Sequence, residues 1–321
     1  NVALGTQALS ADTLGSRTVA IGHATLQTQN FTTATDTYNT AVGFSAGTTL
    51  TTGVQNTILG GLAGDALTDA DRNVALGYAA LSTDVLGSRS TAIGYGALNE
   101  QNFTTATDSY NTAVGYNAGN RVSTGVQNTL IGGLAGDSLT DADSNVAMGV
   151  SALTSDTLGS KSVAVGAGAL FTQNFTTATD SFNTGVENTL IGAGAAAALT
   201  DADYNVVVGR AALDSDTLGS RSVAVGYAAL QAQNFTTATD SYNVAMGFHA
   251  GYGVTTGIRN TFLGGLAGDA LTDADDNVAI GYNSLSADTL GSKSVAIGKG
   301  TLNVQNFTTA TDSHNTAVGY H

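Results

Sequence analysis

Five near-copies of one block make up the chain, and each block opens with a phrase close to Asn-Val-Ala-Leu-Gly. The openings fall at Asn1, Asn73, Asn145, Asn205 and Asn277. The blocks therefore cover residues 1–72, 73–144, 145–204, 205–276 and 277–321, of which the third is 12 residues short and the fifth is truncated. Self-similarity at a fixed spacing is typical of stacked repeat proteins, whose units bury their apolar side chains against their neighbours. We expect one continuous repeat fibre and, because the sequence stops within a repeat, a segment of a longer polypeptide.

A shorter phrase recurs inside each block and gives the length of one coil. In the first block it begins at Asn1, Thr18, Asn39 and Asn56, with steps of 17, 21, 17 and again 17 residues into the next block. Seventeen residues hold two or three short strands and their turns, whereas a helix pair needs about 33 residues. The spacing therefore predicts an all-β parallel solenoid with 17- and 21-residue coils, four to a 72-residue block.

The third block departs from this spacing. Its phrase occurs twice in NTGVENTLIG, at Asn183 and again at Asn188, and five residues are too few for a coil. Counting this pair once gives eighteen coils in the chain. We expect the third block to have one coil fewer than the others, or a local bulge where Glu187 replaces the usual Gly.

The residue types within the phrase predict which side chains face inward. The second position is Val or Thr and the fourth is a large aliphatic residue or Met, as in Val19 and Ile21. Alternate residues of a strand share a face, so we expect both positions to point into the coil and the third, usually Ala, to point outward. Once per block the third position is bulky and apolar, at Ile58, Leu130, Leu190 and Phe262. An outward apolar side chain needs a cover, which either the loops of the block or a neighbouring copy of the chain provides. We favour the copy, which makes these four residues candidates for a subunit interface.

The balance of charge excludes two classes of partner. The net charge is −15, from 25 acidic and 10 basic residues. Such a surface repels phosphate backbones and anionic lipids, so we expect neither nucleic-acid binding nor a membrane partner. No apolar run is long enough to span a bilayer, so we expect no membrane insertion in this segment. The absence of cysteine excludes disulfides and thiolate metal sites.

The phrases SVAIG at Ser294, NTAVGYNAG at Asn111 and NVALGYAAL at Asn73 resemble the head repeats of trimeric autotransporter adhesins, the YadA-like family. The 72-residue block as a whole is similar to the repetitive tail-fibre proteins of marine bacteriophages. The resemblance implies a left-handed parallel β-roll, a homotrimer, and an extracellular place on a virion or a bacterial cell surface. The implied function is the structural shaft of a phage tail fibre used in host attachment, with a bacterial adhesin head as the alternative. A cell-surface glycan or receptor is the implied partner.

The longest coil of each block contains the segment NFTTATD, whose extra residues we expect to project as a loop. Loops on rigid scaffolds often carry recognition. The Phe of this segment either packs the loop onto the solenoid or contacts a carbohydrate or receptor, and each Asn-Phe-Thr is also an N-glycosylation sequon. The candidate ligand-binding residues are therefore Phe31, Phe103, Phe175, Phe235 and Phe307.

A second candidate is the Asp-x-Asp pattern that precedes the first phrase of four blocks. Alternate side-chain oxygens of this kind open a calcium-binding loop, although the mid-loop Gly and the later bidentate Glu of an EF-hand are missing. The same residues also close turns by bonding to the backbone. Calcium is thus the one cofactor considered, with weak candidate ligands at Asp69, Asp71, Asp141, Asp143, Asp201, Asp203, Asp273 and Asp275.

Nothing in the sequence predicts catalysis. Asp12 and Arg17 in DTLGSR, repeated in each block, are expected to form a turn salt bridge. The four histidines occupy different coil positions, and no base is paired with a nucleophile at one defined site. A polysaccharide-cleaving enzyme would need a cleft with two convergent carboxylates. An ice-binding solenoid would need its Thr-x-Thr triplet in every coil, whereas Thr-Ala-Thr occurs once per block, first at residues 33–35.

Overall fold

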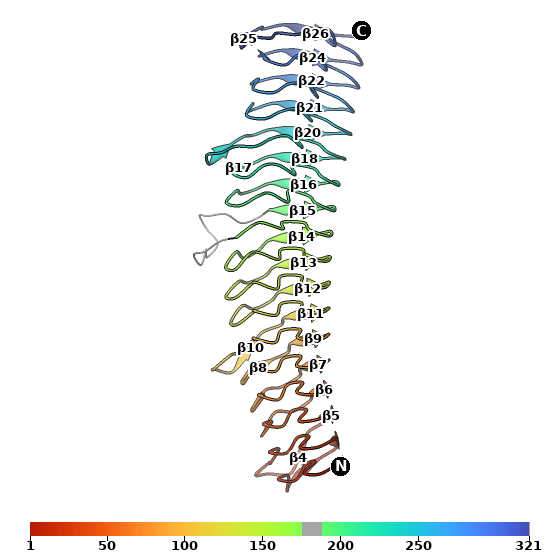
Figure 1. Ribbon diagram of the computed structural model, residues 1–321, viewed down its shortest axis with the longest axis vertical. Helices are drawn as coiled ribbons and strands as arrows, with labels where there is room; N and C mark the ends of the chain where they lie inside the picture. Colours follow the sequence, from red (N-terminus) through yellow and green to blue (C-terminus); the bar gives the residue numbers. More distant parts are fainter. Residues whose placement is uncertain (175–187, 321) are drawn as a thin grey trace. The chain divides into compact units, whose positions relative to one another are not determined.

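The computed structural model describes residues 1–174 and 188–320, and the chain divides into two compact units, Asn1–Ser160 and Lys161–His321. Each unit is a stack of coils whose main strands lie one above the next (Figure 1). All regular elements of the described residues are short strands, without any helix. The all-β parallel solenoid predicted from the spacing is therefore confirmed.

The first unit contains one long parallel sheet and two small ones. The long sheet is formed by β1 (Val2–Leu4), β3 (Val19–Ile21), β5 (Thr40–Val42), β6 (Thr57–Leu59), β7 (Val74–Leu76), β9 (Thr91–Ile93), β11 (Thr112–Val114), β12 (Thr129–Ile131) and β13 (Val146–Met148). Neighbouring strands pair at identical phrase positions, for example Val2 with Val19 and Leu4 with Ile21. The small sheets join β2 (Gly15–Ser16) to β4 (Thr35–Asp36) and β8 (Gly87–Ser88) to β10 (Thr107–Asp108). Each belongs to a 21-residue coil and the coil before it.

The second unit repeats this arrangement. Its long sheet is formed by β14 (Val163–Val165), β15 (Thr189–Ile191), β16 (Val206–Val208), β18 (Val223–Val225), β20 (Val244–Met246), β21 (Thr261–Leu263), β22 (Val278–Ile280), β24 (Val295–Ile297) and β26 (Thr316–Val318). The small sheets join β17 (Gly219–Ser220) to β19 (Thr239–Asp240) and β23 (Gly291–Ser292) to β25 (Thr311–Asp312).

The short third block has one coil fewer, as expected. In its described residues only β13, β14 and β15 carry the phrase, and β14 pairs directly with β15 although their first residues are 26 positions apart. The described residues contain eighteen strands with the phrase, which is the number of coils counted from the sequence. The alternative, a bulge at Glu187, and the extra phrase at Asn183 lie outside the described residues.

The predicted assignment of the two strand faces is wrong. The third position faces the interior, and its side chains are fully buried in coil after coil, including Ala20, Ala41 and Ala75. The second and fourth positions point outward instead; Leu76 is 41% exposed and Met148 is 40% exposed. The alternation itself was read correctly, but alternation defines two faces without stating which of them is inside.

The four bulky third-position residues are consequently core residues and not a subunit interface. Ile58, Leu130, Leu190 and Phe262 all have 0% exposure within the single chain. They fill a part of the coil interior that a Leu from the following turn fills in most other coils. Most coils with Ala at the third position carry an inward Leu in the following turn, whereas the coil of Leu130 has a Gly there. A Cβ on that glycine, Gly136, would lie 2.8 Å from the side chain of Leu130. The exchange keeps the interior close-packed.

A buried polar ladder, which the sequence reasoning did not assign, runs along the first position of the phrase. Asn56, Asn73 and their equivalents from Asn39 to Asn277 are 0–1% exposed. The Asn56 side chain accepts the backbone N–H of Asn73 one coil on (2.9 Å) and donates to the carbonyl of Ala70 (2.7 Å). Each such side chain therefore satisfies two backbone groups that would otherwise be buried without partners. We call this row the asparagine ladder; Ser or Thr replaces Asn at the start of each long coil, as in Thr18 and Ser90.

Candidate functional site

The second and fourth phrase positions form a continuous apolar surface in each unit, which we call the outward face. Each coil contributes one Val or Thr and one Leu, Ile, Val or Met. The side chains are half-buried or exposed in the single chain; Met246, for example, is 45% exposed. Parallel sheets normally have both faces covered, and contiguous exposed apolar patches of this kind mark contact surfaces. The outward face is the strongest candidate site for binding in the molecule.

The residue before each phrase lies on one flank of the outward face, and we call this row the leading column. At several points of this row an arginine and a tyrosine occupy consecutive coils, and their side chains contact one another between the coils. The guanidinium of Arg89 lies 5.3 Å from the ring centroid of Tyr110 and donates to its hydroxyl (2.6 Å). Arg221 lies 4.9 Å from the ring centroid of Tyr204. The described members are Arg17, Tyr38, Gln55, Arg72, Arg89, Tyr110, Gln127 and Ser144 in the first unit and Lys161, Tyr204, Arg221, Tyr242, Arg259, Asp276, Lys293 and His314 in the second.

The residue after the phrase Gly lies on the opposite flank, and we call this row the trailing column. Its aromatic rings stack along the axis; Tyr95 lies 5.4 Å from Tyr78 and 5.5 Å from Tyr116 between ring centroids. They are also exposed, with Tyr95 at 53%. The members are Thr6, His23, Phe44, Gly61, Tyr78, Tyr95, Tyr116, Gly133 and Val150 in the first unit and Ala167, Ala193, Arg210, Tyr227, Phe248, Gly265, Tyr282, Lys299 and Tyr320 in the second.

The phenylalanines of the loop pack onto the solenoid, which is one of the two roles considered for them. Phe31, Phe103 and Phe235 are only 5–6% exposed, and Phe307 is half-buried. Their side chains are therefore not a surface that a carbohydrate or receptor contacts. The remaining candidate, Phe175, lies outside the described residues. The exposed part of each described loop is the Thr-Thr-Ala segment that follows the Phe.

A buried carboxylate fastens this loop to the coil before it. Asp84, with 0% exposure, accepts hydrogen bonds from the backbone N–H groups of Gly87 and Phe103 (both 3.0 Å) and from the Gln101 amide (2.6 Å). The oxygen of the same amide accepts from Asn111, at 2.9 Å. The contacts recur around Asp216. Asp84 does not pair with the nearby arginine, so the expected turn salt bridge is wrong in its acidic partner. The cations pair with the small-sheet aspartates instead, as in Arg89–Asp108 (3.0 Å).

These buried carboxylates predict a pH dependence of stability. Burial raises the pKa of Asp84 and Asp216 above the ordinary value of 3.8, against the opposing effect of their hydrogen bonds. The folded state therefore holds more protons than the unfolded state between the two pKa values, and the free energy of unfolding rises as the pH falls through that range. We expect the double variant Asp84→Asn and Asp216→Asn to flatten this rise. Thermal unfolding followed by circular dichroism between about pH 4 and pH 7 measures it; equal slopes in both proteins would contradict the assignment.

The calcium candidates mostly accept hydrogen bonds from neighbouring coils, in keeping with the turn-closing role. The Asp71 carboxylate accepts the N–H of Val54 (2.8 Å), and Asp69 accepts the hydroxyl of Thr52 (2.7 Å). Asp141 and Asp143 repeat these contacts with Thr124 and Val126, as do Asp273 and Asp275 with Thr256 and Ile258.

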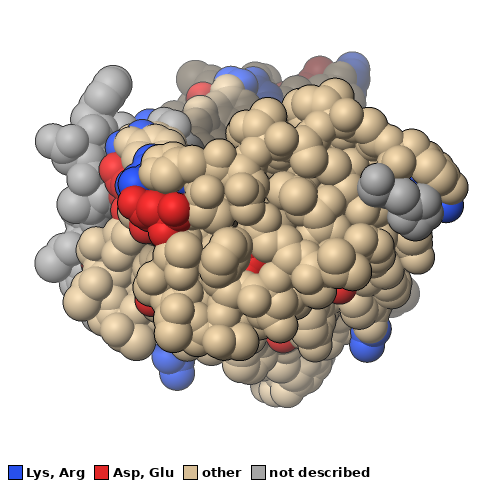
Figure 2. Space-filling view, turned by 90° about the horizontal axis from the view of Figure 1, so that it is seen from above, with Lys and Arg blue, Asp and Glu red and all other residues tan. Residues whose placement is uncertain are grey.

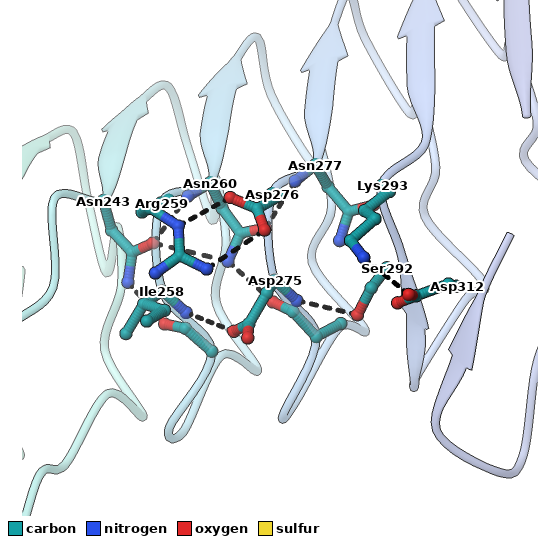
Figure 3. A network of polar contacts seen from close by, with 12 residues as sticks. Asn243, Ile258, Arg259, Asn260, Asp275, Asp276, Asn277, Ser292, Lys293 and Asp312 are labelled. Carbon is teal, nitrogen blue, oxygen red and sulfur yellow. Dashed lines mark hydrogen bonds and ion pairs between the residues drawn. The ribbon is translucent and has the colours of Figure 1, made fainter. Parts of the chain in front are cut away.

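Figure 3 shows Asp275 between two coils, its carboxylate toward Ile258 and its backbone N–H toward the hydroxyl of Ser292 (3.0 Å). The neighbouring carboxylate, Asp276, takes two bonds from Arg259, at 2.6 and 3.0 Å. In the third block the N–H of Asp203 donates to Ser220, and Asp201 is exposed. Across residues 1–174 and 188–320 no group of three or more His, Cys, Asp or Glu side chains is placed to share a metal ion.

Charged side chains are sparse on the molecule. Seen from above, one group of basic and acidic side chains lies together while uncharged atoms make up most of that view (Figure 2). Among the described residues there is no helix with the length and hydropathy of a membrane span. Comparison of the chain with protein-family models, with curated proteins and with solved structures finds no match.

Proposed function

We propose that the chain is a shaft segment of a homotrimeric fibre, most consistent with a phage tail fibre that serves in host attachment. The observation that carries this proposal is the outward face, an apolar surface that each unit leaves uncovered along all its coils. Covering such a surface with further copies of the same chain removes apolar area from water, at roughly 25 cal/mol per Å². Closed symmetric association is the usual form that such self-association takes.

The proposed role is mechanical and not catalytic. Nearly every polar contact described above recurs from block to block, whereas an active site is a single constellation of groups. Stacked coils with a packed interior and a hydrogen-bonded ladder resist bending and local unfolding. The exposed Thr-Thr-Ala segments recur once per block and would offer a glycan or receptor several weak contacts at once. The proposed location is extracellular, on the surface of a virion.

The alternative is the head region of a bacterial trimeric adhesin. It is favoured by phrases such as SVAIG at Ser294, which resemble the head repeats of that family. Antibodies raised against the chain distinguish the two. If the chain is part of a tail fibre, the antibodies are expected to label virion tails. Labelling of the envelope of uninfected cells would instead support the adhesin and contradict the tail fibre.

The native mass of the protein tests the oligomer directly. Multi-angle light scattering of the purified chain is expected to give three times the chain mass of 32.0 kDa. Electron micrographs of the same sample are expected to show straight rods. A mass of a single chain at micromolar concentration would contradict the proposal, because the outward face would then be stable in water without a partner.

A further inference from the structure

At three positions of the trailing column the chain itself does not require a glycine. Gly61, Gly133 and Gly265 do not adopt a positive φ. A Cβ added to them would meet no atom closer than 3.6, 3.9 and 3.5 Å respectively, which is ordinary contact or open space. Nearly all other glycines have either a positive φ or a Cβ position blocked by backbone or side chain. A side chain at these positions would meet neither backbone strain nor a clash within the chain, so its absence points to something outside the chain.

The residue types of the leading and trailing columns match within a coil. In the coils of these three glycines, the leading column carries a long polar side chain: Gln55, Gln127 and Arg259. In many other coils an Arg or Tyr in the leading column accompanies an aromatic ring in the trailing column. Such coils contain the pairs Arg17 and His23, Tyr38 and Phe44, Arg72 and Tyr78, Arg89 and Tyr95, Tyr110 and Tyr116, Arg221 and Tyr227, and Tyr242 and Phe248.

The two members of such a pair cannot touch within one chain. A strand separates them, and six residue steps of extended chain span about 20 Å. Two copies of the chain can, however, be related by a rotation about an axis that runs parallel to the coil axis. The leading column of one copy then lies against the trailing column of the next copy, and equivalent coils lie at the same height along the axis. This holds for any closed ring of parallel copies whose outward faces are turned toward the axis.

We infer that copies of this chain associate parallel and in register, with the leading column of one copy packed against the trailing column of its neighbour. Gln55, Gln127 and Arg259 then lie over Gly61, Gly133 and Gly265 of the neighbour. This inference rests on the proposed homo-oligomer and adds to it the direction, the register and the residues at the seam between copies.

The distribution of charge supports the seam. Of the ten Lys and Arg residues, all but Arg121 belong to one of the two columns. A guanidinium placed on a Tyr ring of the neighbour gains a cation–π contact, which is stronger when the pair is desolvated. Not every coil has a complementary pair: Ser144 is paired with Val150 and Lys161 with Ala167, and one further coil pairs Lys293 with Lys299. Those two side chains bind along their own columns, to Asp312 (2.5 Å) and to the hydroxyl of Tyr320 (3.3 Å).

Disulfide trapping tests the seam, because the chain contains no cysteine of its own. In the double variant Gln55→Cys and Gly61→Cys, oxidation is expected to link each copy to the next and to give covalent oligomers on a denaturing gel. A disulfide within one chain is excluded, since its Cα atoms must lie about 4.4–6.8 Å apart. The variant Arg259→Cys and Gly265→Cys makes the same test in the second unit.

The matched control pairs Gln55→Cys with Gly133→Cys, which places the two thiols one block apart. Four coils separate their heights by about 19 Å, so no cross-link is expected. Two outcomes would overturn the in-register seam if light scattering still gives the mass of an oligomer. One is cross-linking of this control, and the other is the absence of cross-linking in both test variants. The mass of a single chain would overturn both the seam and the oligomer. Each variant is expected to keep its fold, because the substituted side chains lie at the surface of the single chain. Circular dichroism checks this.

Discussion

The variant Leu130→Asp is expected to unfold the coils around β12, whereas Ile131→Asp in the next position is expected to keep the fold and dissociate the oligomer. Leu130 is fully buried in the interior of the coil. A buried, unpaired charge costs several kcal/mol, in addition to the loss of packing that costs about 2–5 kcal/mol for Leu→Ala. Ile131 belongs to the outward face, where a carboxylate stays hydrated in the single chain but is desolvated in an interface.

Two measurements separate these outcomes. Limited proteolysis and circular dichroism report the fold of each variant, and light scattering reports its mass. Loss of structure in Ile131→Asp together with tolerance of Leu130→Asp would restore the assignment of faces that the sequence alone predicted. A folded Ile131→Asp variant that keeps the mass of the unsubstituted protein would place the contact between copies somewhere other than the outward face.

Removal of one member of the asparagine ladder is expected to give the second large effect. The Asn128 side chain accepts the N–H of Asn145 (3.0 Å) and donates to the carbonyl of Ala142 (2.7 Å), and it is 0% exposed. In Asn128→Ala both backbone groups lose a buried partner, and each loss costs about 1–3 kcal/mol. We expect the free energy of unfolding to fall by roughly 2–6 kcal/mol.

The nearby variant Arg121→Ala is the control for this prediction. Arg121 is exposed and belongs to neither the leading nor the trailing column. Its replacement is expected to change the free energy of unfolding by no more than about 0.5 kcal/mol. Urea unfolding followed by circular dichroism compares the two. Similar midpoints for both variants would show that the ladder contributes little.

The sequence predicted the coils well because their length is written directly in the spacing of the phrase. The steps of 17 and 21 residues gave the number of coils, their parallel pairing at equal phrase positions and the missing coil of the third block. The choice between the two roles of Phe103 was open at that stage. It depends on whether the loop folds back over Gly87, and that is decided by a carboxylate, Asp84, which is 19 residues earlier in the chain.

The candidate subunit interface was assigned to the wrong face of the strands because that choice, too, depends on residues outside the phrase. Val and Ile in the phrase suggested an interior and Ala an exterior, as apolar size alone would predict. The turns of each coil, however, bring side chains such as Leu98 and Ala97 into the interior, and these occupy the volume that the larger strand residues would need. No pattern within the phrase reports how wide the coil is. The sequence signal that existed was the exchange of a turn Leu for a small residue in the four coils whose third position is bulky, which carry Gly64, Gly136, Ala196 and Gly268 there.

The sequence by itself thus determined the architecture: an all-β stack of parallel coils, their number and their register, because a strict period leaves one way to align each strand on the next. Only the tertiary structure decided which face of the strand lies inside, which asparagines carry the polar ladder and which glycines are free of any backbone requirement. Those properties depend on volumes and hydrogen-bond partners that come from other coils, and a residue's own place in the repeat does not reveal them.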